Sequence, residues 1–304
     1  MSSLFDRLVV TTLPFVPKAL VHRVASRYVA GETLDYAVRV VRSLEAEGAT
    51  ATIDVLGESV TSREQTVKTR DTYLEVLETI SRHALPANVS IKPTAVGLSI
   101  DPALVRENCR AICTRAAELG TFVRLDMEDS PYTESTLALA LELKKDFPNV
   151  GVVLQAYLRR SLRDLDPLIA ARMNVRICKG IYVEPREIAY KDRRVVVESY
   201  AAMVEKHLAA GCYAAIATHD EACVQRALSS IDRLRLTPDR YEFQMLLGVD
   251  PVLRKLLLGA GHRLRVYVPF GKDWYAYSVR RLKENPSISR HVIRAFLGLP
   301  PAQG

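Results

Sequence analysis

The chain has 304 residues, 48% of them hydrophobic, which is enough for a sizeable core and compatible with one large domain. Its net charge of +7 is dispersed and fits an anionic substrate or membrane surface at least as well as nucleic acid, and without a zinc-finger spacing, an RNA-recognition motif or a basic arm we predict no nucleic-acid partner. The chain has five cysteines and no CxxC motif, which predicts free thiols in a reducing compartment. It has no apolar run long enough to span a bilayer, and charged residues stand near its N-terminus, so we predict a cytoplasmic protein.

Residues 4–45 are predicted to be helical, with interruptions at Pro14 and Pro17 and a turn at Gly31 and Glu32. After this region, short apolar runs alternate with amphipathic helical patterns. The eight predicted strands are Thr50–Leu56, Val89–Ile91, Phe122–Leu125, Val152–Leu154, Val175–Cys178, Tyr213–Ala217, Tyr241–Leu246 and Leu264–Val268. The helices predicted between them include Arg63–His83, Ala103–Leu119, Glu134–Phe147, Val195–Ala210 and Glu221–Ile231.

This alternation implies parallel strands joined by right-handed crossovers. Eight such units in roughly 250 residues have the size of a (β/α)8 TIM-type barrel, an α/β fold. The competing doubly wound sheet would need a glycine-rich phosphate turn, and the sequence contains neither GxGxxG nor GxxxxGK[ST]. We therefore predict one domain over residues 1–304, with N-terminal helices over 1–45 and the barrel over 46–304.

Polar or charged residues stand in or just after every predicted strand. In chain order they are Gly57 with Glu58, Lys92, Asp126, Gln155, Arg176 with Lys179, Thr218 with His219 and Asp220, Gln244, and Tyr267. Barrel enzymes build their active sites at the carboxyl ends of the strands, so this pattern predicts a catalytic mouth. Lys92 and Asp126 are expected on neighbouring strands, where an ammonium and a carboxylate can pair and keep each other ionised.

The segment Tyr267–Glu284 predicts a strand that is stopped by Pro269 and Gly271, a helix N-cap at Asp273 and a helix from Trp274. Four side chains share one face of that helix: Tyr277, Arg280, Arg281 and Glu284. The adjacent arginines are either a solvated face or a clamp that binds a carboxylate through charge-assisted, bidentate hydrogen bonds.

The remaining rim residues suggest a cofactor site more than a metal site. His219 is a lone histidine without a matching set of ligands, so no metal is predicted. Arg176 and Lys179 place two cations beside Gly180, where the backbone can be approached closely. This arrangement suits an electron-rich ring such as an oxidised flavin, whose reduced form is stabilised by nearby positive charge.

In these positions the chain resembles the flavin-dependent proline dehydrogenases in their single-activity bacterial form. The resemblance runs from about Tyr28 to Phe296 and rests on eight motifs in barrel order. They are VLGE ending at Glu58, SIK ending at Lys92, VRLDMEDSP at 123–131, VLQAY at 153–157, VRICKGIYVEP at 175–185, ATHD at 217–220, YEFQ at 241–244, and YVPFG with WYAYSVRR. No counterpart of the aldehyde-dehydrogenase half of bifunctional relatives is found in the chain.

The resemblance implies roles for individual residues. Those expected to bind substrate are Lys92, Arg280 and Arg281 at the proline carboxylate, Tyr277 and Tyr182 over the ring, Tyr267, and Glu58, which pairs with Arg280 and closes the site. The catalytic residues are expected to be Asp126, which orders Lys92, and Tyr182. The residues expected to contact FAD are Met127, Gln155, Arg176, Lys179, Gly180, Ile181, Thr218 and His219, with Arg176 near the flavin N5 and Met127 against the ring.

The implied reaction is hydride transfer from C5 of L-proline to N5 of FAD, which gives Δ1-pyrroline-5-carboxylate and starts proline catabolism to glutamate. A quinone is the implied electron acceptor, so the expected partners are L-proline, a quinone, a downstream pyrroline-5-carboxylate dehydrogenase and, transiently, the inner face of the cell membrane. The chain departs from the family pattern at Pro93, Cys178 and Ile181, of which only Ile181 is expected to touch cofactor or ligand. Tyr277 favours proline over hydroxyproline.

Two other readings of the same residues stay open at this point. A Schiff-base aldolase would use Lys92 or Lys179 as its nucleophile on a similar barrel. A carboxylate-binding barrel without chemistry would bind proline and reduce nothing.

Overall fold

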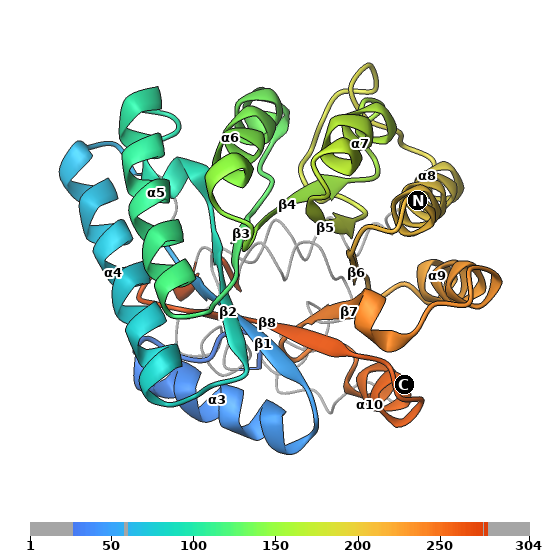
Figure 1. The fold of residues 1–304 in the computed structure, drawn as a ribbon, viewed down its shortest axis with the longest axis horizontal. Helices are drawn as coiled ribbons and strands as arrows, with labels where there is room; N and C mark the ends of the chain where they lie inside the picture. The colour runs from blue at the N-terminus through green and yellow to red at the C-terminus, as the bar shows by residue number, and fades with distance from the viewer. Residues whose placement is uncertain (1–26, 58–59, 276, 279–304) are drawn as a thin grey trace, which may run out of the picture.

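A computed structural model of the protein describes residues 27–57, 60–275 and 277–278. Eight parallel strands form a closed barrel in chain order, and the last strand pairs with the first (Figure 1). The strands are β1 (Thr50–Val55), β2 (Ala87–Ile91), β3 (Val123–Leu125), β4 (Val150–Gln155), β5 (Asn174–Cys178), β6 (Ala214–Ala217), β7 (Tyr241–Leu246) and β8 (Leu264–Phe270). The predicted TIM-type barrel is confirmed.

Helices surround the barrel on the outside (Figure 1). They are α3 (Leu34–Ala46), α4 (Arg63–Arg82), α5 (Pro102–Glu118), α6 (Thr133–Asp146), α7 (Ser161–Ala170), α8 (Arg193–Ala209), α9 (Glu221–Arg233) and α10 (Pro251–Gly259), with short 3₁₀ turns η2 (Pro93–Val96), η3 (Ser130–Tyr132) and η4 (Pro238–Arg240). Their starts follow local signals: Ser62 and Gln65 form a capping box at α4, and Asp220 caps α9 through the N–H of Ala222. The five predicted helices are therefore present with nearly the expected bounds.

The end of β8 differs from the prediction. The strand was expected to stop at Val268, but it continues through Pro269 to Phe270. The register with β7 ends at Tyr267, and beyond that point the carbonyl of Pro269 accepts the N–H of Ala30 instead. A proline is tolerated there because no ladder hydrogen bond to β7 needs its missing N–H.

The helix predicted from Trp274 begins at that residue, after a turn at Lys272 and Asp273. Tyr277 lies on it and is buried. The rest of the expected clamp face, Arg280, Arg281 and Glu284, lies outside the described residues, as do Glu58 and residues 1–26 of the predicted N-terminal helices.

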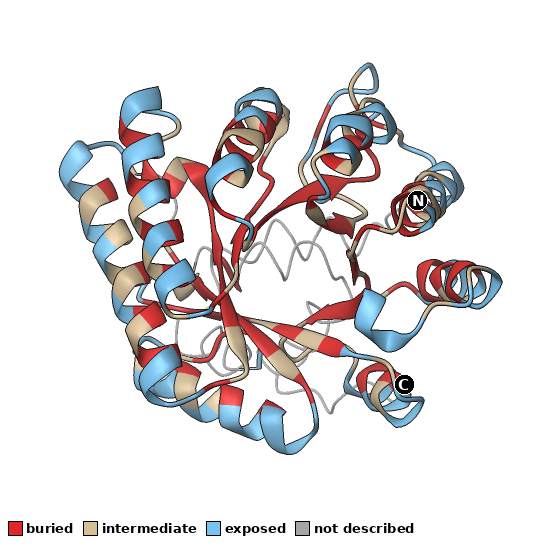
Figure 2. Ribbon diagram, viewed as in Figure 1, coloured by how far each residue is buried: buried red, intermediate tan, exposed pale blue. Residues whose placement is uncertain are grey.

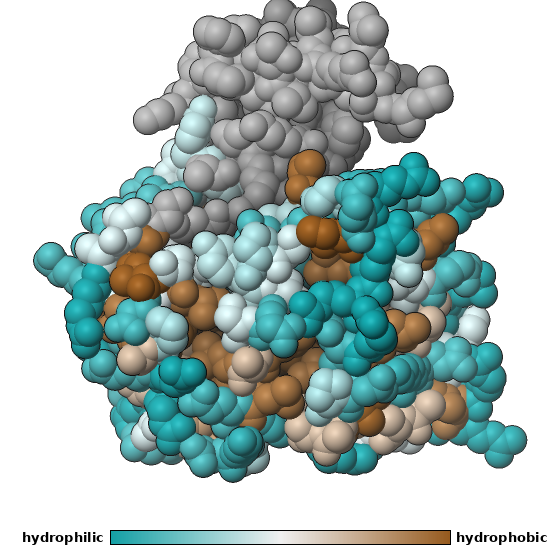
Figure 3. Space-filling view, turned by 90° about the horizontal axis from the view of Figure 1, so that it is seen from above, coloured by the Kyte–Doolittle hydropathy of each residue, from teal (hydrophilic) through white to brown (hydrophobic). Residues whose placement is uncertain are grey.

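The core lies between the strands and the inward faces of the helices, which are buried while their outer faces are exposed (Figure 2). The face of the described residues seen in Figure 3 is mostly hydrophilic, with apolar residues between the polar ones. Over the described part of the chain, no helix combines the length and hydropathy needed to cross a membrane.

The floor of the barrel interior is polar. Arg265 Nε donates to both carboxylate oxygens of Glu242, at 2.9 and 3.0 Å. Arg124 is buried and donates to the carbonyl and the side-chain oxygen of Asn174, both at 2.8 Å. Gly151 leaves room for this contact, because a Cβ atom there would lie 2.4 Å from the Asn174 carbonyl oxygen. Below the rim, Arg265 and Glu242 therefore form an ion pair with each other, and the buried Arg124 has hydrogen-bond acceptors.

Candidate active site

A cavity of about 530 Å³ opens at the carboxyl ends of the strands. Every predicted site residue that the structure describes lines it: Lys92, Asp126, Met127, Gln155, Arg176, Lys179, Gly180, Ile181, Tyr182, Thr218, His219, Tyr267 and Tyr277. Of the predicted set, Glu58, Arg280 and Arg281 lie outside the described residues. The structure thus brings together side chains from six of the strands and the loops that follow them.

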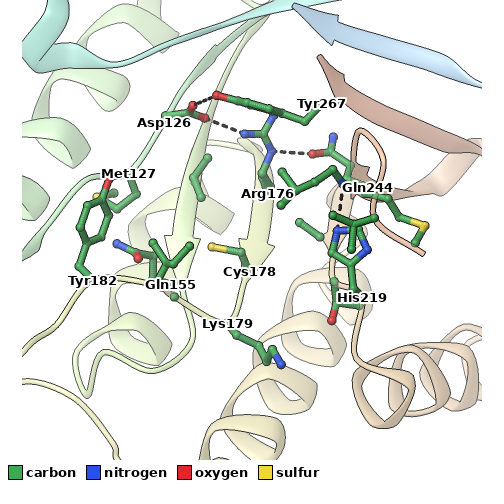
Figure 4. Close-up of a pocket in the computed structure, with 18 of the residues that line it drawn as sticks. Asp126, Met127, Gln155, Arg176, Cys178, Lys179, Tyr182, His219, Gln244 and Tyr267 are labelled. Atoms are coloured by element: carbon green, nitrogen blue, oxygen red, sulfur yellow. Dashed lines mark hydrogen bonds and ion pairs between the residues drawn. The ribbon is translucent and has the colours of Figure 1, made fainter. Parts of the chain in front are cut away.

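Asp126, just after β3, is the centre of a hydrogen-bonded cluster (Figure 4). Its Oδ1 accepts from Arg176 Nη1 at 2.6 Å and from Ser90 Oγ at 2.5 Å, and its Oδ2 accepts from the Tyr267 hydroxyl at 2.7 Å. Burial alone would raise the pKa of Asp126, but the positive charges of Arg176 and Lys92 outweigh it and hold that pKa below its ordinary value. Asp126 is therefore a carboxylate at neutral pH.

Arg176, on β5, is fixed from two sides. Its Nε donates to Gln244 Oε1 at 2.5 Å, and the Gln244 amide nitrogen donates to Glu242 at 2.5 Å. Glu242 thereby sets which end of the Gln244 amide faces the guanidinium. Within the described part of the chain, Arg176 Nη2 has no hydrogen-bond partner, so these donors are available to a ligand in the cavity.

Lys92, just after β2, forms an ion pair that the sequence analysis did not foresee. Its Nζ lies 2.8 and 2.9 Å from the two carboxylate oxygens of Asp54 on β1, and 3.5 Å from the Tyr267 hydroxyl. The predicted pairing of Lys92 with Asp126 is corrected accordingly, because Asp126 makes its ion pair with Arg176. Burial raises the pKa of Asp54, and the ammonium of Lys92 opposes that rise.

Tyr267 is a hydrogen-bond donor within this cluster. Burial and the neighbouring Asp126 and Asp54 carboxylates raise the pKa of its phenol well above the ordinary value. The hydroxyl therefore stays protonated and donates to Asp126. The guanidinium carbon of Arg176 also lies 5.3 Å from the centre of the Tyr267 ring, so both residues face the same carboxylate in fixed positions.

A second charged group lies further out on the rim. Asp220 accepts from Lys179 Nζ at 2.8 Å and from Arg193 at 2.9 Å. Burial would raise the pKa of Asp220, but these two partners and the Ala222 N–H lower it to about 2. The position of the Lys179 side chain is therefore set by the carboxylate that caps α9.

His219 is oriented by the backbone. Its Nε2 accepts the N–H of Leu246 at 2.9 Å, so in the neutral ring the proton resides on Nδ1. Within the described ranges of the chain, no group of three or more His, Cys, Asp or Glu side chains could hold a metal ion.

Gly180 lines the cavity and packs closely against the Tyr157 ring. This residue has φ +104°, and a Cβ atom there would lie 2.0 Å from Cδ1 of Tyr157, which only glycine avoids. Tyr182, Met127 and Gln155 lie together on the side of the cavity opposite Gln244 and His219 (Figure 4).

Of the three departures from the family pattern, Cys178 lines the cavity as well as Ile181, the one expected to touch cofactor or ligand. Burial raises the pKa of the Cys178 thiol to about 11, so it is neutral and not an activated nucleophile. All five cysteines are free thiols, as predicted.

Several residues that were not among the predicted site residues hold the site in place. Asp54, Ser90, Glu128, Asp220 and Gln244 each accept or donate a hydrogen bond to a rim residue or to its loop. For Asp54 the signal was a single charged residue inside a strand whose other residues are uncharged, which is costly unless it is paired.

A family model and several known proteins match most of the chain. The family model for proline dehydrogenase matches residues 37–294. The chain is 38% identical over 278 residues to the proline dehydrogenase of Deinococcus radiodurans and 34% identical over 273 residues to proline dehydrogenase 1 of Bacillus subtilis, with 90% of both chains covered in each case.

Solved structures give the same grouping. Proline utilization A (PutA) from Bdellovibrio bacteriovorus inactivated by N-propargylglycine matches with a TM-score of 0.82 and 25% identity, covering 92% of this chain and 36% of that one. A mutant of Bradyrhizobium japonicum PutA shares the fold with a TM-score of 0.72 and 23% identity, covering 86% of this chain and 31% of that one. The chain thus spans about a third of the length of these PutA proteins.

Proposed function

This chain belongs to the proline dehydrogenase family, and from that membership we propose that it oxidises L-proline to Δ1-pyrroline-5-carboxylate, with FAD as hydride acceptor. The observation that carries the proposal is the cluster of Arg176, Asp126, Tyr267 and Lys92, held in one cavity at the carboxyl end of the barrel. In such a cluster the cations can bind an anionic substrate and cofactor, and the carboxylates hold those cations in position.

The residues of the cavity fit a flavin. Arg176 Nη2 supplies donors that form no hydrogen bond to another described residue, Lys179 adds a second cation, and Gly180 lines the same cavity. When bound, FAD supplies N5 as the acceptor of the hydride and is reduced. Met127, Gln155, Ile181, Thr218 and His219 complete the proposed set of contacts, since all of them line the same cavity.

The proposed task of the substrate residues is positional. The Lys92 ammonium binds the proline carboxylate, together with Arg280 and Arg281 and with Glu58 as the partner of Arg280, all three of which lie outside the described residues. Tyr277 is buried against the cavity and packs over the ring with Tyr182. Holding a substrate in reactive geometry can supply several of the roughly 7–11 kcal/mol that proximity offers.

Asp126 acts in this proposal as a fixed negative charge. Because its pKa is lowered, it does not donate a proton at neutral pH, and instead it orients the Arg176 guanidinium and the Tyr267 hydroxyl. The ordered cation can then stabilise negative charge that develops on the reduced cofactor.

The aldolase reading is less well supported. A Schiff-base lysine must lose its proton to become a nucleophile, and both candidates are held beside carboxylates, Lys92 by Asp54 and Lys179 by Asp220.

A quinone is the proposed final electron acceptor, and its solubility in lipid brings the protein transiently to a membrane surface. The product is the substrate of a pyrroline-5-carboxylate dehydrogenase, which we propose as the downstream partner in catabolism to glutamate.

The visible spectrum of the purified protein tests the proposal. A yellow protein that loses its absorbance under anaerobic conditions with L-proline, and does so poorly with hydroxyproline, is the expected result. A colourless protein that stays inert after FAD is supplied would contradict it. Trapping of substrate on the protein by borohydride would then favour the aldolase, and proline binding without reduction would favour a binding barrel.

A further inference from the structure

The loop between β5 and α8 carries Ile181, Tyr182 and Val183 and closes one side of the cavity. Both ends of this loop are tied to one residue: the Tyr157 N–H donates to the Lys179 carbonyl, and the Tyr157 carbonyl accepts the Tyr190 N–H, each at 2.8 Å. Residues 179–190 therefore form an Ω-type loop with its ends closed on Tyr157.

The middle of this loop is held by Glu184. It is the one buried residue among 181–188, and its neighbour Val183 is fully exposed. Its two carboxylate oxygens accept from the backbone N–H and from the hydroxyl of Ser130, each at 2.7 Å. A buried carboxylate is costly unless donors satisfy it, and Ser130 supplies one donor to each oxygen.

Ser130 belongs to the loop after β3, three residues beyond Met127. The Glu184 contact therefore joins the segment that carries Tyr182 to the segment that carries Met127. Figure 4 shows Tyr182 and Met127 next to each other on the same side of the cavity. Tyr182 thus lies between two fixed points, Gly180 against the Tyr157 ring and Glu184 on Ser130.

We propose that Glu184 is a positioning residue, a latch that binds Ser130 and thereby holds Tyr182 over the substrate site. This inference rests on the proposed function for the identity of the substrate, but the latch itself is a property of the fold. If the latch opens, the segment that carries Tyr182 loses one of its fixed points while the cluster around Asp126 stays intact, because none of that cluster's hydrogen bonds involves Glu184.

The test uses the full FAD-loaded chain and four variants. Glu184→Gln keeps the shape but removes the negative charge and one of the two acceptor oxygens, so that the contact with Ser130 is no longer charge-assisted. Ser130→Ala removes the hydroxyl alone, and the double variant combines the two changes. Glu187→Gln is the matched control, because Glu187 is an exposed carboxylate on the same loop. Deuterium exchange of the backbone over residues 181–184 reports the latch independently of catalysis, and steady-state kinetics with L-proline report its effect.

We expect Glu184→Gln to speed exchange over 181–184 by about tenfold, because a hydrogen bond to a charged group is lost. KM for proline should rise by a similar factor, and kcat should change by less than about twofold. Ser130→Ala should do the same to a smaller extent, the double variant should match Glu184→Gln, and Glu187→Gln should behave like the parent protein.

Unchanged exchange in both single variants would overturn the latch, as would an equal effect of Glu187→Gln. Faster exchange with an unchanged KM would overturn the positioning of Tyr182. A parent protein that does not oxidise proline at all would refute the proposed function, and the exchange measurements would still decide whether the latch exists.

Discussion

Asp126→Asn removes the charge that faces Arg176 but keeps the size of the side chain. Both partners are nearly buried, with 8% of the Arg176 side chain and 11% of the Asp126 side chain exposed. Breaking a buried ion pair by removing one partner costs about 3–5 kcal/mol, because the other charge stays desolvated and uncompensated. The new amide also turns an NH₂ towards Ser90 or Tyr267, both of which donate to the carboxylate in the native protein. We expect a loss of this size from the free energy of unfolding.

The assay is urea unfolding at pH 7 of the flavin-free parent, Asp126→Asn, Arg176→Met and the double variant, so that cofactor binding does not contribute. Each single variant should lose about 3–5 kcal/mol, and the double variant should lose clearly less than the sum, because it buries no unpaired charge. All three variants should fail to reduce flavin with proline. Losses that add to within about 0.5 kcal/mol would refute the reasoning, since they would mean that the two charges do not stabilise one another.

Further substitutions test other parts of the site. Gly180→Ala should lower FAD content and cost at least about 1–3 kcal/mol of stability, because φ is +104° and the new Cβ would overlap the Tyr157 ring; a parent-like protein would contradict this. Arg281→Met should raise KM for proline far more than it alters flavin content, whereas lost flavin with an unchanged KM would show that the arginine is misplaced. Since the pKa of Asp220 is lowered to about 2, its ionised form stabilises the fold above about pH 4, and this contribution is lost as pH falls towards 2. The unfolding free energy of Asp220→Asn should lack that part of the acid decline; an identical decline would contradict it.

Much of the fold could be predicted from the sequence, because strand and helix patterns alternate with few exceptions. The end of β8 was harder to predict, since a proline normally interrupts a strand. Whether Pro269 breaks the ladder depends on which strand its N–H side faces, and that is fixed by the register with β7 and by the contact with Ala30. Neither is visible in the local sequence.

The members of the site were easier to predict than their partners. Lys92 and Asp126 end neighbouring strands, which suggests a pair, but in a barrel the side chains that meet inside depend on the tilt and stagger of the strands. Lys92 reaches back to Asp54 on β1, and Asp126 reaches across to Arg176 on β5. The order of motifs along the chain does not specify the stagger of the strands, so these two ion pairs could be identified only in the structure.

The closure of both loop ends on Tyr157 has a consequence for how this barrel can vary. Because the Lys179 carbonyl and the Tyr190 N–H meet the backbone of a single residue, the entry and exit points of the loop are set by the segment that follows β4 and not by the loop's own length. Insertions or exchanged sequences between these two points leave the strand register untouched. Apart from Ile181, Tyr182 and Glu184, to which the proposals above give roles, the residues between these points can therefore vary without rebuilding the barrel.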